Sequence, residues 1–187
     1  GSASVYVTGS HADIWIGYPG TQSVSEGRPI DPDLATLLWM QPAISQVEPF
    51  QWVDGEWHGP MGGNGGVTVF VSGIEPDAHG LMFAHALSPR LRARLREPDA
   101  VIVDRADLDK LGAHVGSNAS LNGHHVRVVG VTNGLRALGG VNVLASLETA
   151  QRLDEDADDA GRPTYLVARV RAGYDVDAVV RRLRAQH

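Results

Sequence analysis

The chain has 187 residues, 43% of them hydrophobic and 20% charged, a balance typical of a folded protein with one substantial core or two smaller ones. Its formal net charge of −6, from 22 acidic and 16 basic residues, argues against a protein that binds nucleic acid or anionic lipid by neutralising phosphate groups. Because the chain has no cysteine, disulfides, zinc–cysteine sites, iron–sulfur clusters and thiol nucleophiles are excluded.

Two short strands, over residues 4–8 and 13–17, are the first predicted elements. After a loop rich in glycine, proline and serine, a helix begins near Asp31. Asp31 or Asp33 can cap this helix, because an aspartate side chain accepts a hydrogen bond from the unpaired backbone N–H groups of a first turn. The helix ends before Pro42, which cannot continue it.

Two longer strands, over residues 45–55 and 67–73, flank a glycine-rich segment over residues 56–66. This pattern predicts a hairpin with a long, flexible tip. The tip does not match a phosphate-binding loop, because Gly66 is followed by Val67-Thr68 rather than by lysine and serine or threonine. A plain flexible tip and a contact for a partner protein are both open interpretations of the segment.

The middle of the chain mixes strands with brief helices. Residues 90–96 form a basic helical turn that we expect on the surface, and a buried strand over residues 100–103 follows. Asp104 can cap a helical turn over residues 105–111. Asn122-Gly123 then predicts a two-residue hairpin turn, since both residue types tolerate the positive φ that such turns require.

The last third predicts a strand over residues 141–145, a helix over 147–153, a strand over 165–171 and a helix over 176–185. This is a split β-α-β-α order. The acidic stretch at residues 154–159 is interpreted as a solvated connector between two of these elements.

The sequence shows no arrangement of residues typical of a catalytic or metal site. His79 and His85 are six positions apart, and the adjacent His124 and His125 point to opposite faces of a regular strand, so neither pair has metal-ligand spacing. Ser72 lacks the Gly-x-Ser-x-Gly frame of a hydrolase elbow, although a triad assembled from distant residues stays open. We therefore predict no enzyme activity, no cofactor and no metal.

Tryptophans suggest where a partner binds. Trp15 and Trp39 are expected in a core or between lobes, whereas Trp52 and Trp57 flank the hairpin tip and are expected to be exposed. Asp54 and Glu56 lie beside them, but two carboxylates here indicate a polar strand face rather than a glycosidase pair. The predicted partner-contact residues are Trp52, Trp57, His58, Met61 and Asn64.

The stretch PDAVIVDRADLDKLGAHVGSNASLNGHHVRVVGVT, over residues 98–132, resembles the extracytoplasmic core domain of MacB/FtsX-like ABC transporter permeases, especially their DevC-like branch. The resemblance continues at residues 13–16, at 71–76 and at 165–170, so it covers nearly the whole chain. In such permeases the domain lies outside the membrane, between the first and second transmembrane helices, and a cytoplasmic ATPase supplies the energy. No apolar run in this sequence itself approaches the ~20 residues needed to cross a bilayer.

The resemblance implies an α+β fold with two lobes, mixed sheets and short helices. Residues 1–66 and 141–187 are then expected to form a membrane-proximal α/β lobe, and residues 67–140 an inserted, β-rich outer lobe. The implied function is mechanical and non-catalytic: the domain couples cytoplasmic ATP hydrolysis to export or to work in the periplasm or outside the cell. The implied partners are the ATPase, a periplasmic adaptor protein and a second copy of the permease.

An alternative from another class is a small secreted or periplasmic protein that binds or hydrolyses a ligand in the cleft between its lobes. A small ligand at a hundredfold excess over its dissociation constant stabilises such a protein by about 2.7 kcal/mol. A mechanical domain is expected to respond only to its protein partner.

Overall fold

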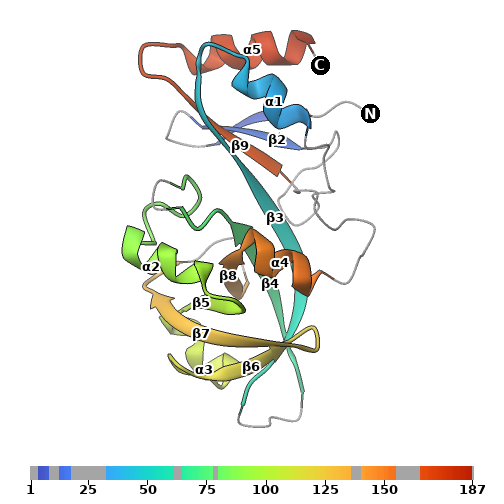
Figure 1. Ribbon diagram of the computed structural model, residues 1–187, viewed down its shortest axis with the longest axis vertical. Coiled ribbons are helices and arrows are strands. Elements are labelled where there is room, and N and C mark those ends of the chain that lie inside the picture. The colour runs from blue at the N-terminus through green and yellow to red at the C-terminus, as the bar shows by residue number, and fades with distance from the viewer. Residues whose placement is uncertain are drawn as a thin grey trace. The chain divides into compact units, whose positions relative to one another are not determined.

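The structure, a computed structural model, describes residues 4–8, 13–17, 33–60, 65–77, 80–135, 140–154 and 165–186. The contacts divide the chain into two units, each with its own hydrophobic core. Figure 1 labels the helices and strands of the chain. Unit 1 comprises Gly1–Phe50 and Gly161–His187, and unit 2 comprises Gln51–Ala160. The chain therefore passes between the units twice, before Gln51 and after Ala160.

Unit 1 contains an antiparallel sheet in the order β1-β2-β9-β3. Its strands are β1 (Ser4–Thr8), β2 (Asp13–Gly17), β9 (Tyr165–Val170) and the first part of β3 (Ile44–His58). The predicted strands at 4–8 and 13–17 are confirmed with the same limits. The central pairing joins β2 to β9, which come from opposite ends of the chain.

Helices α1 (Asp33–Trp39) and α5 (Val176–Gln186) complete the core of unit 1. The buried residues of α5 recur at the spacing of one helical face, and its arginines occupy the exposed face. The core of unit 1 consists of Ile14, Leu38, Ala43, Ile44, Leu166, Ala168, Val170, Val179, Val180 and Leu183. Asp31, one of the two predicted caps, lies outside the described residues. The residues of the predicted acidic connector beyond Asp154 also lie outside them.

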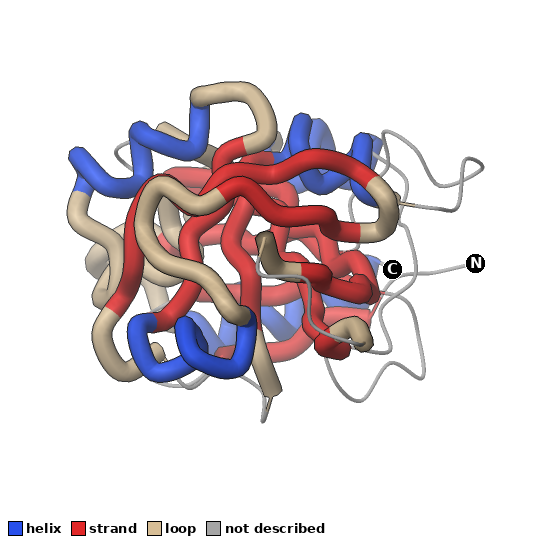
Figure 2. The backbone as a smooth tube through the Cα atoms, turned by 90° about the horizontal axis from the view of Figure 1, so that it is seen from below, coloured by secondary structure: helices blue, strands red, loops and turns tan. Residues whose placement is uncertain are grey.

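Unit 2 contains a closed barrel of six strands in the order β3-β4-β8-β5-β7-β6. Besides the second part of β3, the strands are β4 (Val67–Ile74), β5 (Ala100–Asp104), β6 (Asn118–Leu121), β7 (His124–Thr132) and β8 (Asn142–Ser146). β4–β8 and β5–β7 are parallel pairs, and the other pairs are antiparallel. The barrel closes where Trp57 pairs with Leu121 and His58 pairs with Ser120. Figure 2 distinguishes these strands from the short helices that connect them.

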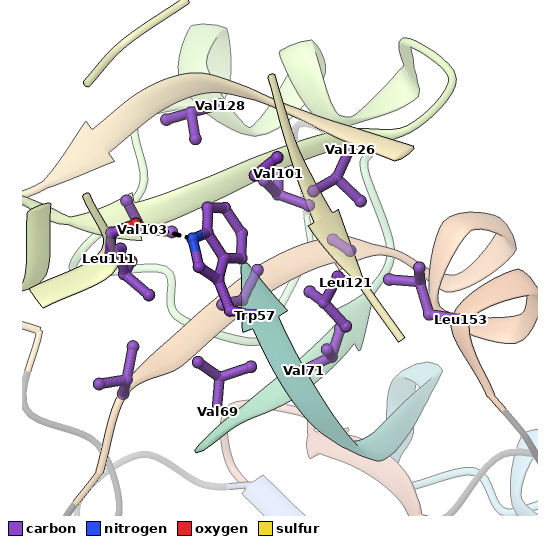
Figure 3. Packing of buried hydrophobic residues seen from close by; sticks show 14 of the residues in the cluster. Trp57, Val69, Val71, Val101, Val103, Leu111, Leu121, Val126, Val128 and Leu153 are labelled. Carbon is purple, nitrogen blue, oxygen red and sulfur yellow. Dashed lines mark hydrogen bonds between the residues drawn. The ribbon is translucent and has the colours of Figure 1, made fainter. Parts of the chain in front are cut away.

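The barrel interior is filled by alternate residues of every strand, as the two-residue period of β structure requires (Figure 3). Most of these residues are valines, whose branched side chains suit a pleated surface. The barrel core consists of Val53, Trp57, Val69, Val71, Val101, Val103, Leu111, Ala119, Leu121, Val126, Val128, Val141, Val143, Ala145, Ala150 and Leu153.

Helix α4 (Leu147–Leu153) contributes to the barrel core and packs closely on β4. A Cβ atom placed on Gly73 would lie 2.5 Å from the Cβ of Ala150, so this approach requires glycine. The N-terminus of α4 is capped by Ser146, whose hydroxyl accepts a hydrogen bond from the N–H of Thr149 at 3.0 Å. The prediction of this helix at residues 147–153 is confirmed.

Asp104 ends β5 and caps the helical turns η3 (Arg105–Asp107) and α3 (Leu108–Leu111), as predicted. Its carboxylate accepts a hydrogen bond from the N–H of Ala106 at 3.0 Å. The other oxygen accepts from the hydroxyl of Thr132 at 2.9 Å and from the N–H of Leu135 at 2.6 Å. The same carboxylate therefore also holds the end of β7, because Thr132 is the last residue of that strand. A buried carboxylate is stabilised most when all of its hydrogen-bond partners are present.

The basic segment at residues 90–96 forms helix α2 (Pro89–Ala93) and the turn η2 (Arg94–Arg96), but it does not lie wholly on the surface as predicted. Arg92 is only 1% exposed. Its guanidinium donates hydrogen bonds to the carbonyl of Glu75, at 3.2 Å, and to the carbonyl of Met82. The arginine is buried because it binds the connection between β4 and α2, a role that its neighbours in the charge run do not share.

The predicted turn at Asn122-Gly123 is confirmed, with φ of 52° and 80° at the two residues. The Asn122 side chain has a further role that the turn pattern did not indicate. Its Oδ1 accepts from the N–H of Glu56 at 2.9 Å, and its Nδ2 donates to the carbonyls of Asp54 and Leu153, each at 3.0 Å. One amide therefore joins the β6–β7 turn to β3 and to the end of α4, at the point where the barrel closes.

The limits of the units differ from the predicted lobes. The resemblance implied an inserted outer lobe over residues 67–140, and the compact unit defined by the contacts comprises Gln51–Ala160. The difference arises because β3 beyond Phe50 pairs with β4 and β6, and because β8 and α4 pack against β4. These pairings join segments far apart in the chain, so local patterns did not indicate them.

Replacing Asn122 with aspartate is expected to lower the free energy of unfolding by about 1–2 kcal/mol, because two carbonyl groups lose a donor and face a carboxylate instead. The measurement is the midpoint of urea unfolding followed by circular dichroism. Asn118→Asp is the matched control, because Asn118 is exposed on the same hairpin and its Oδ1 lies 2.8 Å from Nε2 of His125. Equal midpoints for the two variants would show that the Asn122 amide does not hold the barrel closed.

Candidate partner-binding surface

The outward side of the β3–β4 hairpin combines aromatic and charged side chains. Side chains of successive residues on a strand alternate between the barrel interior and the outside. The outward residues, which we call the hairpin face, are Trp52, Asp54, Glu56, His58, Thr68 and Phe70. The four polar residues of this face are exposed, and the two aromatic residues are half-buried.

Trp52 and Phe70 stack on each other across the hairpin. Their ring centroids lie 4.3 Å apart, and the ring planes differ by 14°. Phe70 pairs with Asp54 in the strand register, so the stacked pair is a diagonal one. The indole N–H of Trp52 donates a hydrogen bond to Oδ1 of Asp54 at 3.3 Å. The phenyl ring and the carboxylate together hold the indole in one orientation.

Glu56 and His58 form a second exposed pair on the hairpin face. Oε1 of Glu56 lies 3.3 Å from Nε2 of His58, and their side chains are 65% and 48% exposed. A pair this exposed contributes little to stability. Its side chains remain accessible to a partner molecule.

The five predicted contact residues have different locations in the structure. Trp52 and His58 lie on the hairpin face. Met61 and Asn64 lie outside the described residues. The expectation that Trp57 is exposed is wrong, because its side chain is 0% exposed and its indole N–H donates to the carbonyl of Leu111 at 3.0 Å inside the barrel (Figure 3).

Trp57 points inward because β3 continues to His58 instead of ending at residue 55. The two-residue period therefore extends from Val53 through Gly55 to Trp57, and all three lie on the interior side. If the alternation had been continued beyond the predicted end of the strand, it would have placed Trp57 on the interior face and Trp52 on the outward face.

Trp39 also differs from its prediction. It was expected in a core or between lobes, but its side chain is 53% exposed at the end of α1. Leu37 and Met40 beside it are 42% and 71% exposed. Trp15 lies in β2 and pairs with Val167 of β9, and its side chain is not among those that the structure describes.

The metal cluster and the serine nucleophile considered from the sequence can be checked in the described residues. No group of three or more His, Asp or Glu side chains in the described ranges is arranged to hold a metal ion. Ser72 is buried and donates to Oδ1 of Asn142 at 2.9 Å rather than to a histidine. His124 and His125 are both exposed, and His79 lies outside the described residues. None of the helices described here is long and apolar enough to span a membrane.

Comparison with known proteins places these observations in a family. The family model for the MacB-like periplasmic core domain matches residues 2–186. The solved periplasmic region of MacB from Actinobacillus actinomycetemcomitans is similar, with 13% identity and a TM-score of 0.52, and the match covers 81% of this chain and 70% of that one. The extracellular domain of the noncanonic ABC-type transporter YknZ from Gram-positive bacteria has 12% identity and a TM-score of 0.58, with 83% and 82% covered. No curated protein matches the chain.

Trp57→Phe is expected to lower the free energy of unfolding by about 2–3 kcal/mol, because the smaller ring leaves a cavity and the carbonyl of Leu111 loses its donor. Trp52→Phe on the hairpin face is the matched control and is expected to cost less than about 1 kcal/mol. Guanidinium unfolding monitored by circular dichroism measures both variants. Similar losses for the two would contradict the separation of an interior Trp57 from a surface Trp52.

Proposed function

Because the chain belongs to the family of MacB-like periplasmic core domains, we propose that it couples ATP hydrolysis in the cytoplasm to work on a partner protein outside the membrane. The domain is the periplasmic or extracellular part of an ABC transporter permease, and its family is non-catalytic. The match over residues 2–186 carries this conclusion. An ATPase is implied as the general partner of such a permease.

The division into two units supports a mechanical role. Each unit has its own core and is compact by itself, so each can act as a body in a mechanical change. The family resemblance implies a membrane-proximal lobe built from the first and last parts of the chain, and unit 1 is built from those parts. We therefore assign the membrane-proximal role to unit 1 and the outer role to unit 2. A change in the permease then alters the contacts that unit 2 makes with a partner, as coupling requires.

We assign partner contact to the hairpin face of unit 2. Trp52 and His58 are accessible there, and an aromatic residue beside charged side chains is the composition that partner proteins favour. Met61 and Asn64, in the segment between the two strands, stay part of the proposed contact. Trp57 has a different role, because its buried indole anchors the hairpin to the barrel rather than touching a partner.

Three finer points belong to the same proposal. The partner at the hairpin face is a periplasmic adaptor protein, the permease belongs to the DevC-like branch, and it works as a dimer. The branch and the dimer are supported by the sequence resemblance alone. The alternative of a small secreted binding protein or hydrolase is disfavoured by the family match over nearly the whole chain.

The test uses the full-length permease in native membranes together with its ATPase. A photo-crosslinking amino acid replaces His58 on the hairpin face, and the control carries it at Asp109, an exposed residue of α3 in the same unit. The proposal expects a crosslink from position 58 to an extracytoplasmic protein, with a yield that depends on ATP. No adduct at position 58, or the same adducts at both positions, would reject the assignment.

Deleting residues 61–64 is expected to leave folding intact and to weaken capture of the partner. Gly59, Pro60, Gly65 and Gly66 then still connect β3 to β4, and halving a loop of this length changes its closure free energy by only about 0.6 kcal/mol. The measurements are the thermal unfolding midpoint and the crosslink yield from position 58. An unchanged midpoint with undiminished crosslinking would remove this segment from the proposed contact.

A further inference from the structure

We propose that Asn133, followed by Gly134, is a site of covalent self-modification in this protein. Its side-chain amide converts to a succinimide and then to aspartate or isoaspartate, and Arg105 promotes the first step. This inference is independent of partner contact at the hairpin face. It is carried by the position of Arg105, by the N–H of Gly134 and by the contrast with the Asn122-Gly123 turn.

The sheet topology brings Arg105 and Asn133 together. β5 and β7 are parallel neighbours, and Asp104 at the end of β5 pairs with Thr132 at the end of β7. The residue that follows each strand therefore lies at the same edge of the barrel. There Nε of Arg105 donates a hydrogen bond to Oδ1 of Asn133 at 2.9 Å. Both residues are exposed, so water reaches the amide.

The reaction needs only groups of the chain and water. The backbone nitrogen of Gly134 loses its proton to solvent base and attacks Cγ of Asn133, which closes the ring and places negative charge on Oδ1. The bond between Cγ and Nδ2 then breaks, and ammonia leaves with a proton from solvent. Water opens the succinimide at either carbonyl, and the products are aspartate and isoaspartate.

Arg105 lies where the negative charge develops. Its guanidinium is always protonated in proteins and already donates to the oxygen that becomes the oxyanion. A fixed donor about 2.7–3.1 Å from a developing oxyanion is the arrangement that stabilises such an intermediate in enzymes, and the Arg105 bond of 2.9 Å lies in this range. The same contact holds the Asn133 side chain at the edge of the barrel.

Gly134 supplies an accessible nitrogen. Glycine has no Cβ to hinder the approach of its nitrogen to the preceding side chain. Its φ of 76° lies in the region that favours glycine. Among the described residues, the N–H of Gly134 has no hydrogen-bond partner that must first be released.

The Asn122-Gly123 turn has the same two residue types, but its amide is held by the fold. Nδ2 of Asn122 donates to the carbonyls of Asp54 and Leu153, and Oδ1 accepts from the N–H of Glu56. Ammonia cannot leave until both bonds donated by Nδ2 are broken. The fold therefore protects Asn122 and leaves Asn133 reactive.

The modification has a structural consequence, because Asn133 lies between two partners of Asp104. The hydroxyl of Thr132 and the N–H of Leu135 both donate to Oδ2 of Asp104. Isoaspartate adds a methylene group to the main chain between these two donors. We therefore expect it to weaken the contact of Leu135 with the carboxylate that caps the turn after β5.

The first test compares the two sites in one protein. The 187-residue chain is incubated in mildly alkaline buffer, both folded and in guanidinium, and digested with trypsin. Mass spectrometry with fragmentation follows peptide 128–136, which contains Asn133, and peptide 111–127, which contains Asn122. In the folded chain Asn133 is expected to react at least about tenfold faster, because Asn122 must first lose its hydrogen bonds. In guanidinium the two sites are expected to react at similar rates.

Two results would overturn the inference. Equal rates in the folded chain would show that the fold does not distinguish the sites. The same difference in guanidinium as in the folded chain would trace it to the local sequence rather than to the contacts of the two amides.

The second test concerns Arg105. Arg105→Met removes the donor and is expected to slow the reaction of Asn133 in the folded chain about fivefold or more. Arg127→Met removes the same charge from an exposed position of β7 and is expected to leave the rate unchanged. Unfolding midpoints verify that both variants are folded, and in guanidinium the two are expected to react alike. A rate in Arg105→Met equal to or above that of Arg127→Met would reject the promoting role of Arg105.

Discussion

The short pairing of β3 with β6 is the constraint on which unit 2 depends. Only two residue pairs join these strands, Trp57 with Leu121 and His58 with Ser120, yet they turn an open sheet into a closed barrel. Two side chains reinforce this junction. The Asn122 amide binds β3 and α4, and the Trp57 indole binds the carbonyl of Leu111. A closed barrel has no free strand edges, so the hairpin face is held on a rigid support.

The same residues explain why the candidate surface has its composition. Closing the barrel requires apolar side chains at alternate positions of β3, and the positions between them are then left to face outward. Trp57 serves the interior and Trp52 the exterior, although they are five residues apart and both are tryptophan. The interior set fills the barrel core, whereas the exterior set is the surface to which we assign partner contact. Packing and the proposed recognition thus use the two faces of one hairpin.

Local signals allowed much of this fold to be predicted from sequence. The strands at 4–8 and 13–17, the helix at 147–153 and the Asn122-Gly123 turn depend on patterns within a few residues, and the structure has them where they were expected. Long-range contacts account for the differences. The burial of Arg92 depends on carbonyl groups of Glu75 and Met82, and the extent of unit 2 depends on pairings across the barrel. On the candidate surface, Trp52 lies within the predicted strand and faces outward, whereas the directions of Trp57 and His58 depend on where β3 ends.

The placement of unit 2 within the sequence of unit 1 also bears on how the chain folds. All strands of the barrel lie before residue 147, whereas the sheet of unit 1 needs β9, which begins at Tyr165. During synthesis from the N-terminus, unit 2 can therefore complete its hydrogen bonds while β2 and the first part of β3 still lack their common neighbour. Prior folding of unit 2 also shortens the length of unfolded chain that the β2–β9 pairing must close. Folding of the inserted unit thus favours the later folding of the unit that surrounds it in sequence.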